Sequence, residues 1–264
     1  MISQRDFQVL SNLVRRDVSS RFKGSFFGIG WALLTPLLTL SVFTLMFGSV
    51  FGVKWAAAGA NQNHSVGFFA LALFCGLMFF NFYAEVLSKS TGAILNNATF
   101  VKKIVFPIEI LPAVVTGSAM VQLGISLAVL LVFTLIITGS LSLYILLAPL
   151  TIVPFVLLVQ GIAWVLASLG VYFRDISQMI GPVLTASMFL SPMFTPRTSM
   201  PEWLRPWVVL NPLTVPIENF RAVVLMDTLP SWWALAAYFC VALIVALLGR
   251  LFFEKTRGGF ADVI

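Results

Sequence analysis

The chain of 264 residues is poor in charge, because its 16 Lys+Arg and 10 Asp+Glu make up only 10% of the residues, against about 25% in a soluble domain. Apolar residues make up 59%, and the mean hydropathy is +1.00. A soluble core cannot absorb this apolar surplus, so the composition excludes a soluble enzyme, a nucleic-acid-binding module, a disordered chain and a secreted disulfide scaffold. It predicts a single all-α membrane domain over residues 1–264, and the net charge of +6 is interpreted as topological.

Residues 4–23 predict an amphipathic helix ahead of the first apolar stretch. Phe7, Leu10, Val14, Val18 and Phe22 are spaced three and four residues apart, and basic and polar residues occupy the other faces. Such a helix is suited to lie on the inner membrane surface. Packing against a partner is the alternative interpretation, and the two are compatible.

Six apolar stretches approach or exceed the length of about 20 residues that a spanning helix needs. They cover residues 28–53, 66–88, 111–137, 142–171, 176–195 and 231–253. With both termini in the cytoplasm, 12 of the 16 Lys and Arg residues lie on the inner side and 4 on the outer side. This excess predicts that orientation.

The inner segment 89–110 joins the second and third stretches. It combines apolar residues, among them Phe100 and Val101, with the pair Lys102-Lys103, and it reaches Pro107. This pattern predicts a piece that docks its apolar side into a cleft of a partner. The alternative is that the two lysines only hold the topology.

The outer segment 196–230 predicts two short helices. Ser199 and Glu202 form a capping box ahead of Trp203 and Trp207. Asn211-Pro212 interrupts the pattern, and a second helix runs from Thr214 through Glu218 and Arg221 to about Met226. We expect a re-entrant or gate element, and the alternative is a lid on lipid headgroups.

Aromatic residues are frequent in the apolar stretches. Phe43, Phe47 and Phe51 share one face of the first stretch, and Phe189 and Phe194 lie in the fifth. An aromatic passage suits a glycan, because the C–H faces of sugar rings stack on aromatic rings. A stripe that faces lipid or packs between helices is the ordinary alternative.

The sequence offers no catalytic or metal site. The dipeptide Gly-Lys of a phosphate-binding loop is absent, and the single histidine and two cysteines give no metal cluster. The spans also carry almost no ionisable groups of the kind that ion-coupled carriers place on their pathway. We therefore expect no enzyme and no bound cofactor, but a transport protein that is either passive or driven by a partner.

Five segments together resemble a known family, in the same order and over nearly the whole chain. They are RRDVSSRFKGSFFGIGWALLTPLL, STGAILNNATFVKKIVFPIEILP, YFRDISQMIGPVL, SPMF and LNPLTVPIENFRAVVL. The chain resembles the membrane subunit of ABC-type polysaccharide exporters, with the Wzm-type O-antigen permeases as the nearest branch and teichoic-acid permeases as relatives.

This resemblance implies a homodimer of six-span subunits in the bacterial inner membrane. It also implies two copies of a separate P-loop ATPase that binds ATP and Mg, and an undecaprenyl-type lipid-linked polysaccharide as the cargo. Residues 4–23 then match an interface helix, 89–110 a coupling loop and 199–226 the gate helices. An ABC permease for another substrate, such as teichoic acid, capsule, a small lipid or a drug, is the alternative.

The candidate site residues follow from these assignments, and we expect no catalytic residue among them. The substrate-path candidates are Trp31, Phe43, Phe47, Phe51, Phe189 and Phe194; the coupling candidates are Asn96, Asn97, Phe100, Val101, Lys102 and Lys103; the gate candidates are Trp203, Trp207, Glu218 and Arg221.

Overall fold

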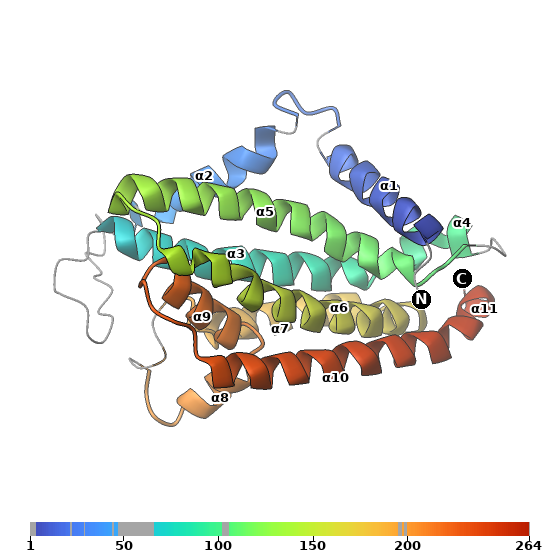
Figure 1. Ribbon diagram of the computed structural model, residues 1–264. Coiled ribbons are helices and arrows are strands. Elements are labelled where there is room, and N and C mark those ends of the chain that lie inside the picture. Colours follow the sequence, from blue (N-terminus) through green and yellow to red (C-terminus); the bar gives the residue numbers. More distant parts are fainter. Residues whose placement is uncertain are drawn as a thin grey trace.

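The computed structural model describes residues 4–21, 23–28, 30–43, 45–46, 66–101, 106–194, 197 and 200–263. Within these ranges every regular element is a helix, so the all-α prediction is confirmed for the described part of the chain. The long helices lie side by side in an elongated bundle, and α1 (Gln4–Arg21) crosses it obliquely (Figure 1).

Helix α3 forms the centre of the bundle. It spans Val66–Ser90 and is largely apolar and largely buried, as expected of a helix that is surrounded by others. Phe79 packs edge to face on Phe155 and Phe220, with ring centroids 5.2 and 5.1 Å apart. The helices that contact α3 are α2 (Gly30–Phe43), α5 (Ile110–Thr138), α6 (Ala148–Tyr172), α7 (Ile176–Phe189) and α9 (Thr214–Val224).

Helices α6 and α10 (Trp232–Thr256) form the most extensive helix pair. Their backbones touch where Gly161 faces Gly249, since a methyl group built on Gly249 would lie 2.2 Å from the Gly161 carbonyl oxygen. Small residues allow this approach, which is typical of helix pairs in membranes. The two glycines therefore fix how closely α6 and α10 can pack.

Four helical segments are long and apolar enough to cross a membrane: Gly67–Ser90, Ile110–Thr138, Leu143–Tyr172 and Trp232–Gly259. They correspond to the expected spans 66–88, 111–137, 142–171 and 231–253. The outer side of α10 exposes apolar residues along its length, including Phe239, Leu243, Leu247 and Leu251. Such a surface suits contact with lipid.

The first and fifth expected spans are represented by shorter helices. Helices α2 and α7 have 14 residues each, which corresponds to about 21 Å and falls short of the roughly 30 Å hydrocarbon layer. Helix α7 ends at Phe189, ahead of Pro192 and before the expected end at residue 195. Residues 47–53 of the first expected span lie outside the described ranges, so the count of six spans stays a prediction.

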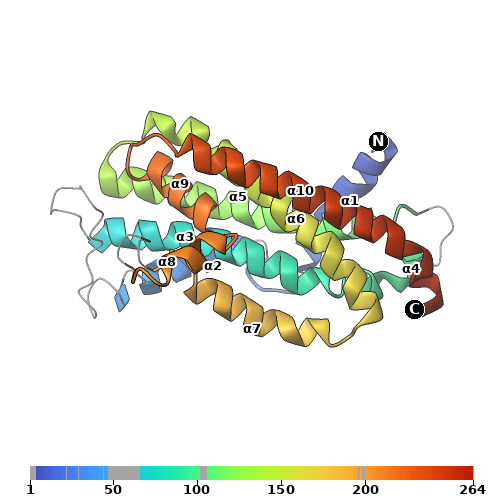
Figure 2. The same ribbon diagram turned by 90° about the horizontal axis from the view of Figure 1, so that it is seen from below.

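Short elements close the two ends of the bundle. One end carries Lys89, Arg174, Lys255 and Arg257 and is called the basic end below. The elements there are η2 (Leu95–Asn97), α4 (Ala98–Val101), η5 (Arg257–Gly259) and α11 (Phe260–Val263). The opposite end holds η3 (Leu143–Leu147), α8 (Arg205–Leu210) and α9. Figure 2 shows α7 on the side of α3 away from α10.

Candidate functional site

A polar cavity opens between the end of α1 and helices α2, α3 and α5. Its volume is about 580 Å³. It extends along α3 from Glu85 to Phe74, which is about 16 Å of helix. Polar groups from all four helices line it, namely Arg21, Thr35, Thr39, Asn81, Glu85, Gln122 and Ser126. Because two of its walls, α3 and α5, are helices of spanning length, this polarity marks a candidate functional site.

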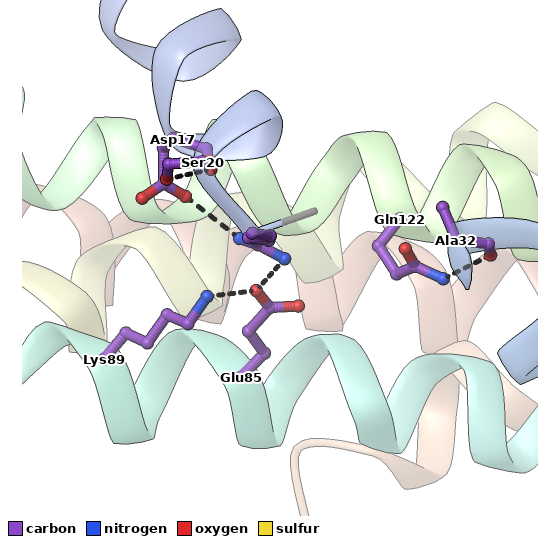
Figure 3. A network of polar contacts seen from close by, with 7 residues as sticks. Asp17, Ser20, Ala32, Glu85, Lys89 and Gln122 are labelled. Atoms are coloured by element: carbon purple, nitrogen blue, oxygen red, sulfur yellow. Dashed lines mark hydrogen bonds and ion pairs between the residues drawn. The ribbon is translucent and has the colours of Figure 1, made fainter. Parts of the chain in front are cut away.

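A charged network closes the end of the cavity nearest the basic end (Figure 3). Glu85 Oε1 accepts from Arg21 Nη1 at 2.5 Å and from Lys89 Nζ at 2.9 Å. Arg21 Nη2 also pairs with Asp17 Oδ2 at 3.2 Å. Two carboxylates thus face two cations, and the network ties the last turn of α1 to α3.

The rest of the cavity is uncharged. Gln122 Nε2 donates to the Ala32 carbonyl at 3.0 Å and links α5 to α2 (Figure 3). The hydroxyls of Thr35 and Thr39 donate to carbonyls one turn earlier in α2. Amide and hydroxyl groups of this kind can exchange their hydrogen bonds with a neutral polar ligand, whereas no nucleophile lies beside a base among the lining residues.

Of the predicted path residues, Trp31 lines this cavity and is 38% exposed. Phe189 lies elsewhere, at the end of α7, where it is 64% exposed and stacks on the half-buried Phe194 at 6.3 Å. Phe43 is the last residue of α2, and Phe47 and Phe51 lie outside the described residues. The structure therefore does not bring Trp31 and the Phe189–Phe194 pair into one site.

The predicted coupling residues lie at the basic end. Asn96 is exposed, and Asn97 donates from Nδ2 to the Ala93 carbonyl at 2.9 Å. Phe100 and Val101 belong to α4, and Lys102 and Lys103 lie outside the described residues. The amphipathic N-terminal helix is also present, and its face with Leu10, Val14 and Val18 is half-buried and packs on α5, whereas Phe7 is exposed and Phe22 is not described.

At the opposite end, the first of the two expected short helices begins later than predicted. Residues 201–204 form a turn, and α8 starts at Arg205 with Pro206 in its first turn, while Ser199 lies outside the described residues. A proline in the first turn needs no backbone donor, which explains this start. Trp203 and Trp207 are 73% and 62% exposed. The second helix, α9, starts at Thr214 as predicted and ends at Val224.

The two charged gate candidates differ in burial. Arg221 is only 2% exposed, and it donates to the carbonyls of Ala72, Pro192 and Met193 at 2.8, 2.5 and 2.7 Å. Glu218 is partly exposed and lies 3.9 Å from Arg197. Burial raises the pKa of the Glu218 carboxyl above its ordinary value near 4.5, and Arg197 and Arg221 counteract this shift only in part.

Sequence reasoning missed the polar cavity and the Arg21–Glu85 contact. Asn81 and Gln122 carried a usable signal, because amide side chains within apolar stretches are rare and point to buried or functional faces. The ion pair carried none, since its partners stand 64 positions apart in the chain.

Comparison with known proteins gives one family and consistent relatives. Residues 8–225 match the ABC-2 type transporter family. The "O-antigen export system permease protein RfbA" of Myxococcus xanthus is 25% identical over 258 residues, which cover 97% of this chain and 95% of the relative. Two Klebsiella pneumoniae proteins of the same name are 23% and 22% identical over 260 residues, which cover 98% of this chain and 95% of each relative.

These matches confirm the resemblance to O-antigen export permeases that the sequence motifs indicated. They agree with a bundle whose four long helices are apolar enough to cross a membrane, two of which, α3 and α5, line the polar cavity. The chain is an integral membrane protein and belongs to the ABC-2 type transporter family.

Proposed function

We propose that this chain is the channel-forming subunit of an ATP-driven exporter that moves a lipid-linked, O-antigen-like polysaccharide across the bacterial inner membrane. The observation that carries the proposal is the polar cavity with Trp31 at its wall. Sugar hydroxyls pair with amide and hydroxyl groups, and their C–H faces stack on an indole ring. The names of the RfbA relatives support the same cargo class.

The energy comes from a separate P-loop ATPase that binds ATP and Mg, with two copies per transporter. This chain has no Gly-Lys dipeptide for a phosphate-binding loop of its own. Residues 89–110 contact the ATPase, since the short elements η2 and α4 project at the basic end of the bundle. The chain itself acts as a transport subunit and not as an enzyme.

The basic end faces the cytoplasm. Lys and Arg side chains concentrate on the cytoplasmic side of membrane proteins, and this end carries Lys89, Arg174, Lys255 and Arg257. Within the described ranges, the opposite end carries three such residues, Arg197, Arg205 and Arg221. Both termini are therefore cytoplasmic, and α8 and α9 form the outer gate element.

The transporter is a homodimer whose path forms between two copies. Ile180 is the one buried residue of helix α7, and the polar residues Ser177, Gln178 and Thr185 of this helix are exposed. Polar side chains on a helix within the bilayer face other protein or water rather than lipid. The hydroxyls of Ser177 and Thr185 donate to the carbonyls of Arg174 and Gly181 in their own chain, and their free acceptor positions and the Gln178 amide face a second α7 or the cargo. Phe189 at the end of this helix then borders the path.

Surface polysaccharide in a strain that lacks the gene tests the function. Complementation with the wild-type gene restores the polymer, whereas Trp31→Ala lowers its amount on the order of ten-fold through loss of stacking. Lipid-linked precursor accumulates in the inner membrane at the same time. Trp233→Ala is the matched control, because Trp233 is 85% exposed on α10 and lies outside the cavity.

Trp31→Phe keeps an aromatic ring and restores most of the export. The proposal fails if the strain without the gene displays normal surface polysaccharide, or if Trp31→Ala and Trp233→Ala behave alike at equal permease abundance.

A further inference from the structure

The basic end contains a hydrophobic cluster that is separate from the main core. Its buried members come from four segments of the chain and are Ala93, Ile94, Leu111, Ala167, Val171, Phe253 and Phe260. Phe106 and Ile108 pack against it. We call this group the basic-end cluster. It joins both ends of the 89–110 loop, the last turns of α6 and the C-terminal segment.

The C-terminal segment folds back into this cluster. Phe260 is fully buried, and its ring lies 5.5 Å from that of Phe253 and 5.9 Å from that of Tyr172. Tyr172 donates from its hydroxyl to the Thr256 carbonyl at 2.8 Å. The segment after the last spanning helix is thus packed onto the end of α6, and Figures 1 and 2 both place α11 at the same end of the bundle as α4.

The 89–110 loop is held at both of its ends. At its start, α6 touches the loop backbone, since a methyl group built on Gly170 would lie 2.0 Å from the Thr91 carbonyl oxygen. At its end, Trp164 donates from Nε1 to the Glu109 carbonyl at 3.3 Å. Arg257 of the C-terminal segment pairs with the Glu109 carboxylate at 2.9 Å. The loop therefore rests on α6 and on residues 253–260.

We propose that residues 257–263 are the rigid support of the coupling loop, and that Phe260 is a positioning residue that passes displacement of this loop to α6 and α10. The inference rests on the proposed function, in which the loop contacts the ATPase. A closely packed cluster transmits displacement from one element to the next. If a void lies beneath the coupling loop, the loop can move while α6 and α10 stay in place. Loss of the support therefore uncouples ATP hydrolysis from export.

The test uses the complex of the permease with the P-loop ATPase that co-purifies with it. Phe260→Ala leaves a void in the cluster, so we expect it to lower the export per ATP hydrolysed by about ten-fold or more, while ATP hydrolysis stays within about two-fold of wild type. Val263→Ala is the matched control, because Val263 lies on the same short helix and is exposed. Phe260→Leu recovers most of the coupling.

A second variant avoids any loss of folding. Arg257 and Glu109 are partly exposed, so Arg257→Glu leaves the cluster intact and lowers the coupling by about two- to five-fold, the range of an exposed ion pair. Adding Glu109→Arg restores the pair with its charges exchanged and recovers the coupling.

Three results overturn the inference: unchanged coupling in an assembled Phe260→Ala complex, an Arg257→Glu loss that Glu109→Arg does not repair, or an equal loss in Val263→Ala. An equal loss in Val263→Ala would show that residues 257–263 form a docking surface and not a support. Failure of the proposed function is distinct, because it appears as wild-type permease that neither binds an ATPase nor exports.

Discussion

Arg221 is the residue on which the opposite end of the bundle depends most. Its guanidinium connects α9 to the Ala72 carbonyl of α3 and to the Pro192 and Met193 carbonyls beyond α7. Replacement by Leu removes one donor from each of three buried carbonyls, of which only that of Ala72 lies within a helix and keeps a backbone partner, at a cost of about 3 kcal/mol or more. We expect Arg221→Leu to lower the thermal midpoint of the purified permease sharply.

Arg197→Leu is the control for Arg221→Leu. Arg197 is partly exposed and lies 3.9 Å from Glu218, and exposed pairs of this kind contribute at most about 1 kcal/mol. Arg221→Lys keeps the charge but not the planar fork, so its midpoint falls between those of wild type and Arg221→Leu. Equal midpoints for Arg197→Leu and Arg221→Leu would contradict the role of Arg221.

Glu218 makes the stability of the same region depend on pH. Burial raises its pKa in the folded chain above the ordinary value near 4.5, so the folded state binds more protons than the unfolded state. Stability therefore falls as pH rises from about 4.5 through the raised pKa, and it is constant above it. Thermal midpoints measured at several pH values should show this fall in wild type and a weaker fall in Glu218→Gln. Identical pH profiles for the two proteins would contradict the role of Glu218.

For these residues, the sequence predicted the side of the membrane but not the burial or the hydrogen-bond partners. Counting charges by side of the membrane placed Arg221 on the outer side, but such a count contains no information on depth. Its burial follows from carbonyls at positions 72, 192 and 193, which only the folded chain brings together. The Arg21–Glu85 pair was missed for the same reason.

At the scale of elements, α6 and α10 form the most extensive helix pair among the described residues, and their backbones touch. A side chain at Gly249 meets the Gly161 carbonyl, which is backbone and cannot rotate away. We expect Gly249→Ala to cost about 1–3 kcal/mol through overpacking and to lower the amount of permease in the membrane. Gly124→Ala is the control, because the space beside Gly124 is open, and an equal loss there would refute the explanation.

The predictability of the elements follows their length and polarity. Helices α3, α5, α6 and α10 were expected within a few residues, because long apolar stretches have no other stable structure in a membrane. The end of α7 was not, since the apolar pattern continues past Phe189 toward Pro192, and the end of α2 borders residues outside the described ranges. The start of α8 was missed because a capping-box pattern also fits the turn at residues 201–204.

At the scale of the whole molecule, the exposed face of α7 predicts where two copies meet. In a variant without Cys75 and Cys240, single cysteines at Gln178 and Thr185 should crosslink into permease dimers in membranes. A cysteine at Leu248, on the apolar outer side of α10, should not. Crosslinking at Leu248 but not at Gln178 or Thr185 would place the second copy against α10 and contradict this prediction.

ATP-dependent transfer of lipid-linked polysaccharide in proteoliposomes tests the central claim most directly. The permease and its co-purifying P-loop ATPase are reconstituted together, and polymer that reaches the far side of the membrane is quantified. We predict transfer that requires both subunits and hydrolysable ATP and that falls on the order of ten-fold in Trp31→Ala. Transfer by the permease without ATP, or none by an intact complex that hydrolyses ATP, would contradict the account.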